Sequence, residues 1–477
     1  MLTLSETHRK NTHEKDKNDR DHTRQVYAER RSRYTAAVEQ LANEKAAVRL
    51  GGIYTLVGLA DEWLADNSLT KDKQNEEGQV IINNLCSYIR SPFPLAEKID
   101  EYKAYKKFEE LKEKESENLL NEVEQFELKA LVERFTNSQD YKEPEDITAD
   151  YATFHEEQDV RRTIFVEMGK RSSVISNKEE SDVTVTPDAW SDFDFDFSRA
   201  PIFYPLNGLT IEKGNFPGAK FYADTTFFKV TFNSDANFGK ATFTSNVNFG
   251  ETTFNNLAYF NEATFNNLAG FVETTFNSKA HFSKATFNYE AHFGKATFNY
   301  EAHFDKATFN NLAYFGETTF NHESHFGKAT FIQTAYFSKA TFTQNANFSA
   351  ATFTQNAHFS AATFTGNVDF GGAEFSEKAD FWSVEFSGDA NFKDSYFEKY
   401  APIFAYDSGY SGSARFSNRI NWADSNFSVR SGSQPINPGD ATLDGKTFRI
   451  PLGTVVFNPD SWDEESKKYT HISDRAK

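Results

Sequence analysis

The chain has 477 residues, a formal net charge of −19 and a single cysteine, Cys86. This length allows two or three domains, and the acidic balance argues against a nucleic-acid-binding surface. One cysteine excludes an intramolecular disulfide framework and any zinc site that needs several thiolates. No apolar run of about 18 residues occurs, so the sequence predicts no membrane span.

Residues 1–33 form a charged tail rich in Lys and His that lacks the apolar core of a signal peptide. Residues 34–170 then show apolar side chains at helical spacing, which predicts an α-helical region packed as a small right-angled or HEAT-like bundle. One of these helices must end before Pro92. Two interpretations stay open: a helical cap or spacer for the rest of the chain, or a separate partner-binding module. The apolar positions on which the helices are predicted are Tyr34, Ala37, Val38, Leu41, Ile53, Leu56, Val57, Ala60, Trp63, Ile81, Leu85, Tyr88, Ile89, Leu119, Leu120, Val123, Phe126, Leu131, Val132, Val160, Ile164 and Met168.

Residues 171–213 are expected to be a linker followed by a capping coil. The acidic run Glu179–Asp182 has neither a helical nor a strand period, which is typical of a linker. From Asp192 to Phe197, Asp and Phe alternate strictly, which predicts a short strand with one apolar face. The three aspartates lack the Gly and the Glu that a calcium loop needs, so no cation is expected there.

Phenylalanine dominates residues 214–400, where it recurs 34 times at alternating spacings of five and six residues. An eleven-residue unit is therefore repeated 17 times without a register slip, as in Ala291-His-Phe-Gly-Lys-Ala-Thr-Phe-Asn-Tyr-Glu301. Such a period predicts a solenoid in which the rings stack along the axis about 4.8 Å apart. A four-sided coil would take two of these units, and a flattened, two-sided coil of a single unit remains an alternative.

One structural core ladder is predicted from the two Phe positions of every second eleven-residue unit. Its members are Phe216, Phe221, Phe238, Phe243, Phe260, Phe265, Phe282, Phe287, Phe304, Phe309, Phe326, Phe331, Phe348, Phe353, Phe370, Phe375, Phe392 and Phe397.

The unit resembles that of bacterial pentapeptide-repeat proteins, in which a small residue stands two positions before a central Leu or Phe. Ala258 with Phe260 and Ala263 with Phe265 occupy these positions. The helical stretch Ala47-Val-Arg-Leu-Gly-Gly-Ile-Tyr-Thr-Leu56 is similar to the segment before the repeats in actinobacterial relatives. The resemblance implies a right-handed, four-sided β-helix after an N-terminal helical region, in a variant where Phe replaces Leu and every second pentapeptide has one extra residue.

The outward positions form columns of repeated residues. Thr242, Thr264 and Thr286 begin one column, and Asn255, Asn266 and Asn277 begin others, so we expect hydroxyls and amides to bond to their own copies along the axis. A four-sided coil would also stack His281, His303 and His325 on one face, with His292 and Tyr314 on another. Solvated imidazoles are the preferred interpretation, and a metal ladder is the alternative. We therefore expect no metal and no cofactor.

After Tyr400 the period breaks, and residues 401–477 are predicted to form an irregular cap over the last Phe layer. Strand-like stretches occur at Thr447–Ile450 and Thr454–Phe457. No metalloprotease, phosphate-binding or nucleophile-elbow motif is present, and the nearest approach, Gly409-Tyr-Ser411-Gly412, has the wrong spacing. The sequence therefore predicts no enzymatic activity.

Two functions follow as hypotheses. The first is a non-enzymatic protein-interaction scaffold with an unknown partner. Such a scaffold is expected in the cytoplasm, and at the membrane if the natural start of the chain lies upstream, because membrane helices often precede this region in the relatives. The second is a DNA-mimicking regulator of a type II topoisomerase, DNA gyrase, as the family resemblance also suggests. Residues 214–400 hold 18 acidic and 12 basic residues, and Lys284, Lys295 and Lys306 interrupt the middle of the rod, which favours the first hypothesis.

Overall fold

The structure is a computed structural model that describes residues 2–136, 147–177, 183–204, 206, 214–406, 412–420 and 426–477. It divides into a unit of residues 1–89 and 146–195 and a second unit of residues 90–145 and 196–477. The acidic run at 179–182 and the Gly409–Ser411 stretch, both singled out in the sequence, lie outside the described residues.

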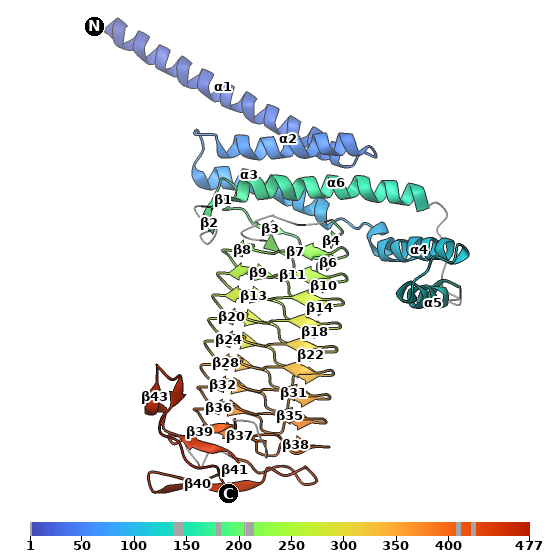
Figure 1. The fold of residues 1–477 in the computed structure, drawn as a ribbon. Helices are drawn as coiled ribbons and strands as arrows, with labels where there is room; N and C mark the ends of the chain where they lie inside the picture. The colour runs from blue at the N-terminus through green and yellow to red at the C-terminus, as the bar shows by residue number, and fades with distance from the viewer. Residues whose placement is uncertain are drawn as a thin grey trace. The chain divides into compact units, whose positions relative to one another are not determined.

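The first unit is helical. It contains α1 (Leu2–Leu41), α2 (Ala46–Leu64), α3 (Lys71–Arg90) and α6 (Ile147–Ser172) (Figure 1). The apolar residues that predicted these helices form their core, since Leu56, Leu85 and Ile164 are all fully buried. Helix α1 begins at Leu2, so the residues expected as a charged tail are helical. Helix α3 ends at Arg90, two residues before Pro92, because proline disfavours helical geometry in the residue before it.

Several buried polar side chains of this unit form hydrogen bonds with one another. The Nε of Arg161, a residue only 1% exposed, donates to Glu157 at 2.7 Å, and the Tyr88 hydroxyl donates to the same carboxylate at 2.9 Å. The indole Nε1 of buried Trp190 donates to Asp61 at 2.9 Å. These bonds satisfy groups whose burial would otherwise cost free energy.

A β-hairpin replaces part of the linker expected from the sequence. Strand β1 (Ser173–Asn177) pairs antiparallel with β2 (Val183–Pro187). Val183 and Val185 alternate with threonines, a period-two pattern that the neighbouring acidic run obscured.

Helices α4 (Leu95–Ser116) and α5 (Glu122–Thr136) form a helical hairpin in the second unit. Phe108, Leu111 and Leu128 form its core. The break between the helices falls at Asn118, which has φ +57°. Asparagine tolerates this left-handed conformation better than most residues, so it suits the connection that follows α4.

Four parallel sheets form the solenoid in the same unit (Figure 1). In each sheet a short strand pairs with the strand four places further along the chain, as β9 (Ala236–Asn237) does with β13 (Ala258–Tyr259). The partners are two eleven-residue units apart, so the coil has four sides and the two-sided coil is excluded. The first sheet runs from β4 (Pro201–Ile202) to β38 (Tyr396–Phe397), and the second runs from β7 (Thr225–Thr226) to β35 (Ala379–Asp380). The third begins at β8 (Thr231–Phe232) and continues through β36 (Glu385–Phe386) and β39 (Arg415–Ser417) to β42 (Val455–Phe457). The fourth runs from β3 (Phe195–Asp196) to β37 (Ala390–Asn391).

Phenylalanine rings fill the solenoid. Every member of the structural core ladder defined above is at most 1% exposed. Phe304 stacks on Phe282 with ring centroids 4.8 Å apart and meets Phe315 edge-to-face at 5.4 Å. Parallel stacking along the axis and edge-to-face contact across it are both favoured by the ring quadrupole.

The five-residue and six-residue steps turn the chain differently. In the five-residue step, Ala241 N donates to Phe238 O at 3.0 Å and Lys240 has φ +58°, which is the geometry of a type II turn. The equivalent residue of every unit from Lys229 to Asp394 has positive φ, and only one of them, Gly372, is a glycine. The backbone N–H of Lys240 donates to Asn261 O of the next coil at 2.8 Å, so the sheet ladder holds this conformation in place.

The C-terminal residues continue one sheet and then fold back. Strand β42 pairs parallel with β39. The hairpin of β40 (Pro438–Leu443) and β41 (Lys446–Pro451) precedes it, and a 3-10 turn (Pro459–Ser461) with the small hairpin of β43 (Trp462–Asp463) and β44 (Lys468–Tyr469) follows. Among the described residues, no helix is both long and apolar enough to cross a bilayer.

Candidate functional site

Asparagine side chains form the ladders that the sequence predicted. Nδ2 of Asn299 donates to Oδ1 of Asn277 at 2.8 Å, and Asn321 donates to Asn299 at the same distance. The predicted threonine ladder is wrong: Thr264 and Thr286 lie in register, but no hydrogen bond joins the hydroxyls of this column in the described part of the chain. Equivalent atoms in successive coils are about 4.8 Å apart, a gap that an amide spans with its separate donor and acceptor. Hydroxyls bond across it elsewhere, since Ser338 and Ser360 lie 3.0 Å apart, but not in this threonine column.

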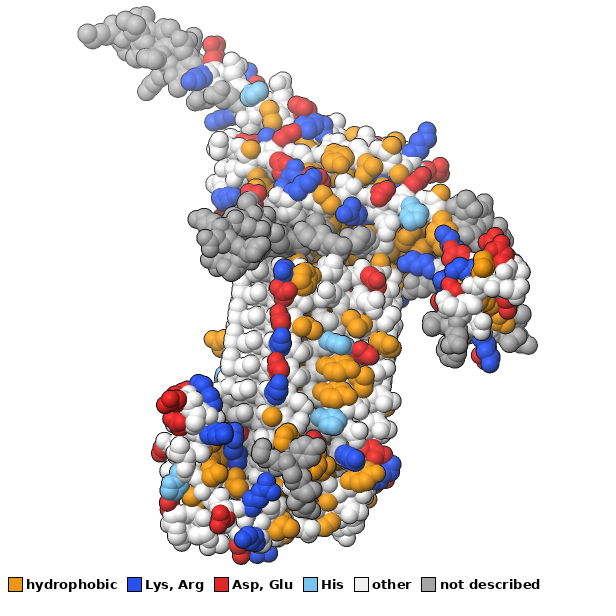
Figure 2. All heavy atoms as spheres, in the orientation of Figure 1, with side chains coloured by type: hydrophobic (Ala, Val, Ile, Leu, Met, Phe, Trp, Pro, Cys, Tyr) orange, Lys and Arg blue, Asp and Glu red, His pale blue; other side chains and the backbone are white. Residues whose placement is uncertain are grey.

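Charged residues form columns beside these ladders. Figure 2 shows one column in which basic and acidic side chains are mixed along the solenoid. Lys295 pairs with Glu273 at 3.4 Å, and Lys339 pairs with Glu317 at 3.2 Å. These residues occupy the left-handed position of the turn, so the side chains project into solvent, where such pairs contribute little to stability.

An aromatic column runs beside this charged column, on strands β19 (Ala291–His292), β23 (Ala313–Tyr314), β27 (Ala335–Tyr336) and β31 (Ala357–His358). We use this name for His292, Tyr314, Tyr336 and His358. The rings of Tyr314 and Tyr336 stack at 5.1 Å, and each contacts the histidine beyond it. All four side chains are half-buried, and Figure 2 shows hydrophobic and His side chains gathered on this face.

A histidine column occupies another sheet, on β17 (Ala280–His281), β21 (Ala302–His303) and β25 (Ser324–His325). His303 stacks on His281 at 4.8 Å and on His325 at 4.7 Å, as the four-sided coil predicted. Partial burial, followed by the neighbouring His303 and Lys279, lowers the pKa of His281. Asp305 lies beside the column, and one ligand atom each from His303, Asp305 and His325 fall within 4.8 Å of one another.

The pKa of Asp305 lies below its ordinary value. Partial burial acts to raise it, but the interactions with His303 and His325 outweigh this effect. Asp305 is not among the residues predicted from the sequence. One feature of the sequence could have indicated it: from Gly239 to Lys393, Asp305 is the only acidic residue that directly follows the first Phe of a unit.

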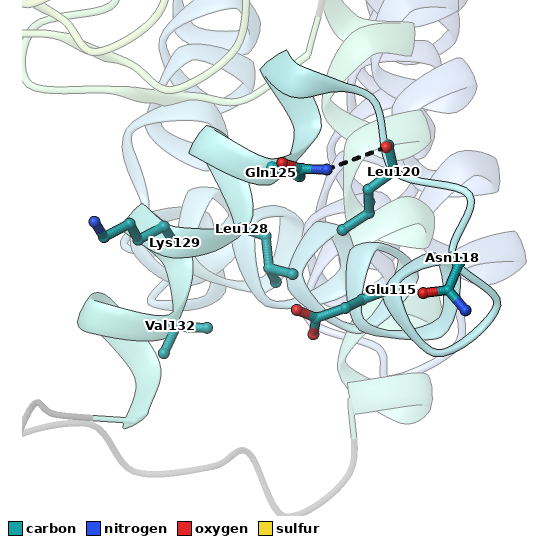
Figure 3. Close-up of a pocket in the computed structure, with 7 residues that line it drawn as sticks. All are labelled: Glu115, Asn118, Leu120, Gln125, Leu128, Lys129 and Val132. Carbon is teal, nitrogen blue, oxygen red and sulfur yellow. Dashed lines mark hydrogen bonds between the residues drawn. The ribbon is translucent and has the colours of Figure 1, made fainter.

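A cavity of about 570 Å³ lies between α4 and α5 (Figure 3). Leu120, Leu128 and Val132 supply its apolar wall, and Glu115 and Lys129 supply its charges. Among the described residues that line it there is no histidine, serine or cysteine, the usual groups of a nucleophilic site.

This protein is a four-sided parallel β-solenoid that follows an N-terminal helical region in the sequence. The class is defined by the four parallel sheets, the inward Phe layers and the register of two units per coil. A family model described as pentapeptide repeats (9 copies) matches residues 249–297, 293–341, 326–374 and 348–396. This part of the chain is therefore a pentapeptide-repeat solenoid, as the resemblance implied. No curated protein and no solved structure matches the chain.

Proteins with pentapeptide repeats are generally non-enzymatic interaction proteins. Their solenoids are generally non-catalytic, because a regular rod offers little concave surface.

Proposed function

We propose that this protein is a non-enzymatic, cytoplasmic scaffold that binds another protein through a side of its solenoid. The domain boundaries predicted from the sequence, at residues 33, 170, 213 and 400, are part of this proposal. No cofactor and no direct contact with nucleic acid are involved.

The observation that carries the proposal is the aromatic column. Tyrosine is enriched in protein interfaces because it combines a large rigid ring with a polar hydroxyl. Tyr314 and Tyr336 are held in place by their stacking contacts, so little side-chain entropy is lost when a partner binds. Gly294 and Gly316 lie beside the column and leave the rings accessible from that side.

The charged columns argue against the alternative, a DNA mimic. A mimic needs a continuous acidic face, whereas Glu262 lies between Lys240 and Lys284, at 3.8 and 3.4 Å. Glu273 and Glu317 are likewise paired with lysines. The acidic charge of these columns is therefore locally neutralised.

The test uses the full-length protein as bait in a bacterial lysate, with quantitative mass spectrometry of the bound proteins. The double variant Tyr314→Asn/Tyr336→Asn should fold, because Asn248 occupies the same column. We expect at least one protein to be recovered by the wild type and at least tenfold less by this variant.

The matched control is Tyr289→Asn/Tyr300→Asn. Both tyrosines are more exposed, 45% and 51%, and lie at a bend where Asn256 and Asn267 stand in other units. This control should recover the partner like the wild type. Equal loss in both variants, or loss in neither, would rule out the aromatic column as the binding face.

A further inference from the structure

From the histidine column we propose a second site: His303, Asp305 and His325 bind one divalent transition-metal ion of the Zn²⁺ type. The site lies on a different sheet from the aromatic column and does not depend on the scaffold function.

The ligand chemistry is that of a three-residue metal site. Two imidazoles and one carboxylate suit Zn²⁺ and its transition-metal neighbours rather than Mg²⁺ or Ca²⁺, which prefer oxygen ligands. Nδ1 of His303 lies 3.9 Å from Oδ2 of Asp305, and the ring of His325 is the next in the stack. Three protein ligands leave a fourth position open for water.

A carboxylate lies near the Nε2 atom of each ring. Nε2 of His303 faces Glu301 at 3.4 Å, and Nε2 of His325 faces Glu323 at 3.7 Å. A ligating histidine usually directs its other ring nitrogen at such a carboxylate, which fixes the tautomer and raises the basicity of the ligand nitrogen. Glu301 and Glu323 therefore leave Nδ1 of each ring for the metal.

The backbone leaves room for Asp305. Gly327 occupies the equivalent position one coil further on, and a Cβ added there would lie 3.0 Å from Oδ1 of Asp305. One coil earlier the same position is Ser283, so this position supplies no carboxylate to His281. The three ligands thus come together at one place in the histidine column.

Binding requires a local contraction. The ligand atoms lie within 4.8 Å of one another, whereas ligands at about 2.0–2.2 Å from a tetrahedral ion are closer together. The side chains of His303, Asp305 and His325 are 22%, 38% and 26% exposed, so the rings and the carboxylate can rotate toward the ion without disturbing the Phe core.

The experiment is a calorimetric titration of ZnCl₂ into the full-length protein and three variants. The repeat supplies substitutions that it already accommodates: serine at position 283 for Asp305→Ser, and asparagine at positions 237 and 347 for His303→Asn and His325→Asn. His281→Asn is the matched control, since it removes a stacked histidine that is not a ligand. Circular dichroism checks that each variant is folded.

We expect one Zn²⁺ equivalent whose affinity falls at least tenfold in Asp305→Ser and in His303→Asn/His325→Asn, and stays unchanged in His281→Asn. Because the chain has 11 histidines, the test depends on the differences in zinc affinity between the variants and not on zinc binding alone. The absorption spectrum of bound Co²⁺ gives an independent readout and should lose its intense tetrahedral bands in Asp305→Ser. Equal zinc affinity in the wild type and both ligand variants, or no zinc binding by the wild type, would overturn the proposal.

Discussion

At the scale of single residues, the solenoid depends on one aromatic residue type at the two inward positions of each unit. Phe304 is fully buried and contacts rings above, below and across the axis, at 4.8, 4.9 and 5.4 Å. Because the interior is close-packed, the volume of a removed ring cannot be recovered by small shifts of its neighbours. Non-glycine residues such as Lys240 also hold left-handed backbone conformations, at a cost that the sheet ladder offsets.

Phe304→Ala should destabilise the solenoid by about 3–5 kcal/mol, because it combines lost apolar burial with a cavity in the middle of the rod. Chemical denaturation followed by far-UV circular dichroism measures the change. Phe228→Ala is the control: Phe228 lies outside the period and is 46% exposed, so its loss should change stability by no more than about 0.5 kcal/mol. Similar effects of the two substitutions would contradict the role of the Phe core.

At the scale of elements, ion pairs fix α1 against the α2–α3 connection. The guanidinium of Arg30 on α1 donates to Asp66 at 2.6 Å and lies over the ring of Trp63 at 4.5 Å. The Ser68 hydroxyl also donates to Asp66 at 2.6 Å. Hydrogen bonds from Ser68, and then from Arg30, lower the pKa of Asp66.

This lowered pKa predicts a pH-dependent contribution to stability. Asp66 binds its proton less readily in the folded protein than in the unfolded chain, so its stabilising effect is complete above the ordinary aspartate pKa of about 4 and is lost as the pH falls through the lower folded value. The free energy of unfolding of the wild type should therefore exceed that of Asp66→Asn at pH 7, and the difference should shrink below about pH 4.

Glu39→Gln is the control for this measurement, since the Glu39 side chain is exposed and makes no ion pair among the described residues. Denaturant titrations at several pH values measure the difference. A gap between the wild type and Asp66→Asn that stays constant from pH 7 to pH 3 would show that Asp66 does not act through its charge.

At the scale of the whole molecule, the net charge and the placement of the charges give different expectations of whether the solenoid presents a continuous acidic face. The chain carries −19 overall, yet the charged columns of the solenoid contain both acidic and basic side chains (Figure 2). Long-range steering and polymer mimicry depend on the field at the binding face rather than on total charge.

The full-length protein in molar excess should leave DNA supercoiling by a bacterial gyrase unchanged, because lysines such as Lys284 and Lys295 interrupt the acidic columns. An agarose-gel supercoiling assay measures this, with a known gyrase inhibitor as the positive control. Dose-dependent inhibition by the wild type would favour the DNA mimic over the scaffold.

The spacing of phenylalanine by itself determined the solenoid, since an eleven-residue period with inward rings has few other physical solutions. The helical spacing of Leu56, Leu85 and Ile164 likewise determined the buried faces of three helices. Both patterns record which side of an element avoids water, and that information is local.

Only the tertiary structure decided between the two-sided and the four-sided coil, because both place identical side chains in register. It also decided that the asparagine columns form hydrogen-bonded ladders and the threonine column does not, which depends on the distance between coils. The tertiary structure also decided the grouping of His303, Asp305 and His325, because residues two units apart become neighbours only after the chain has closed four sides.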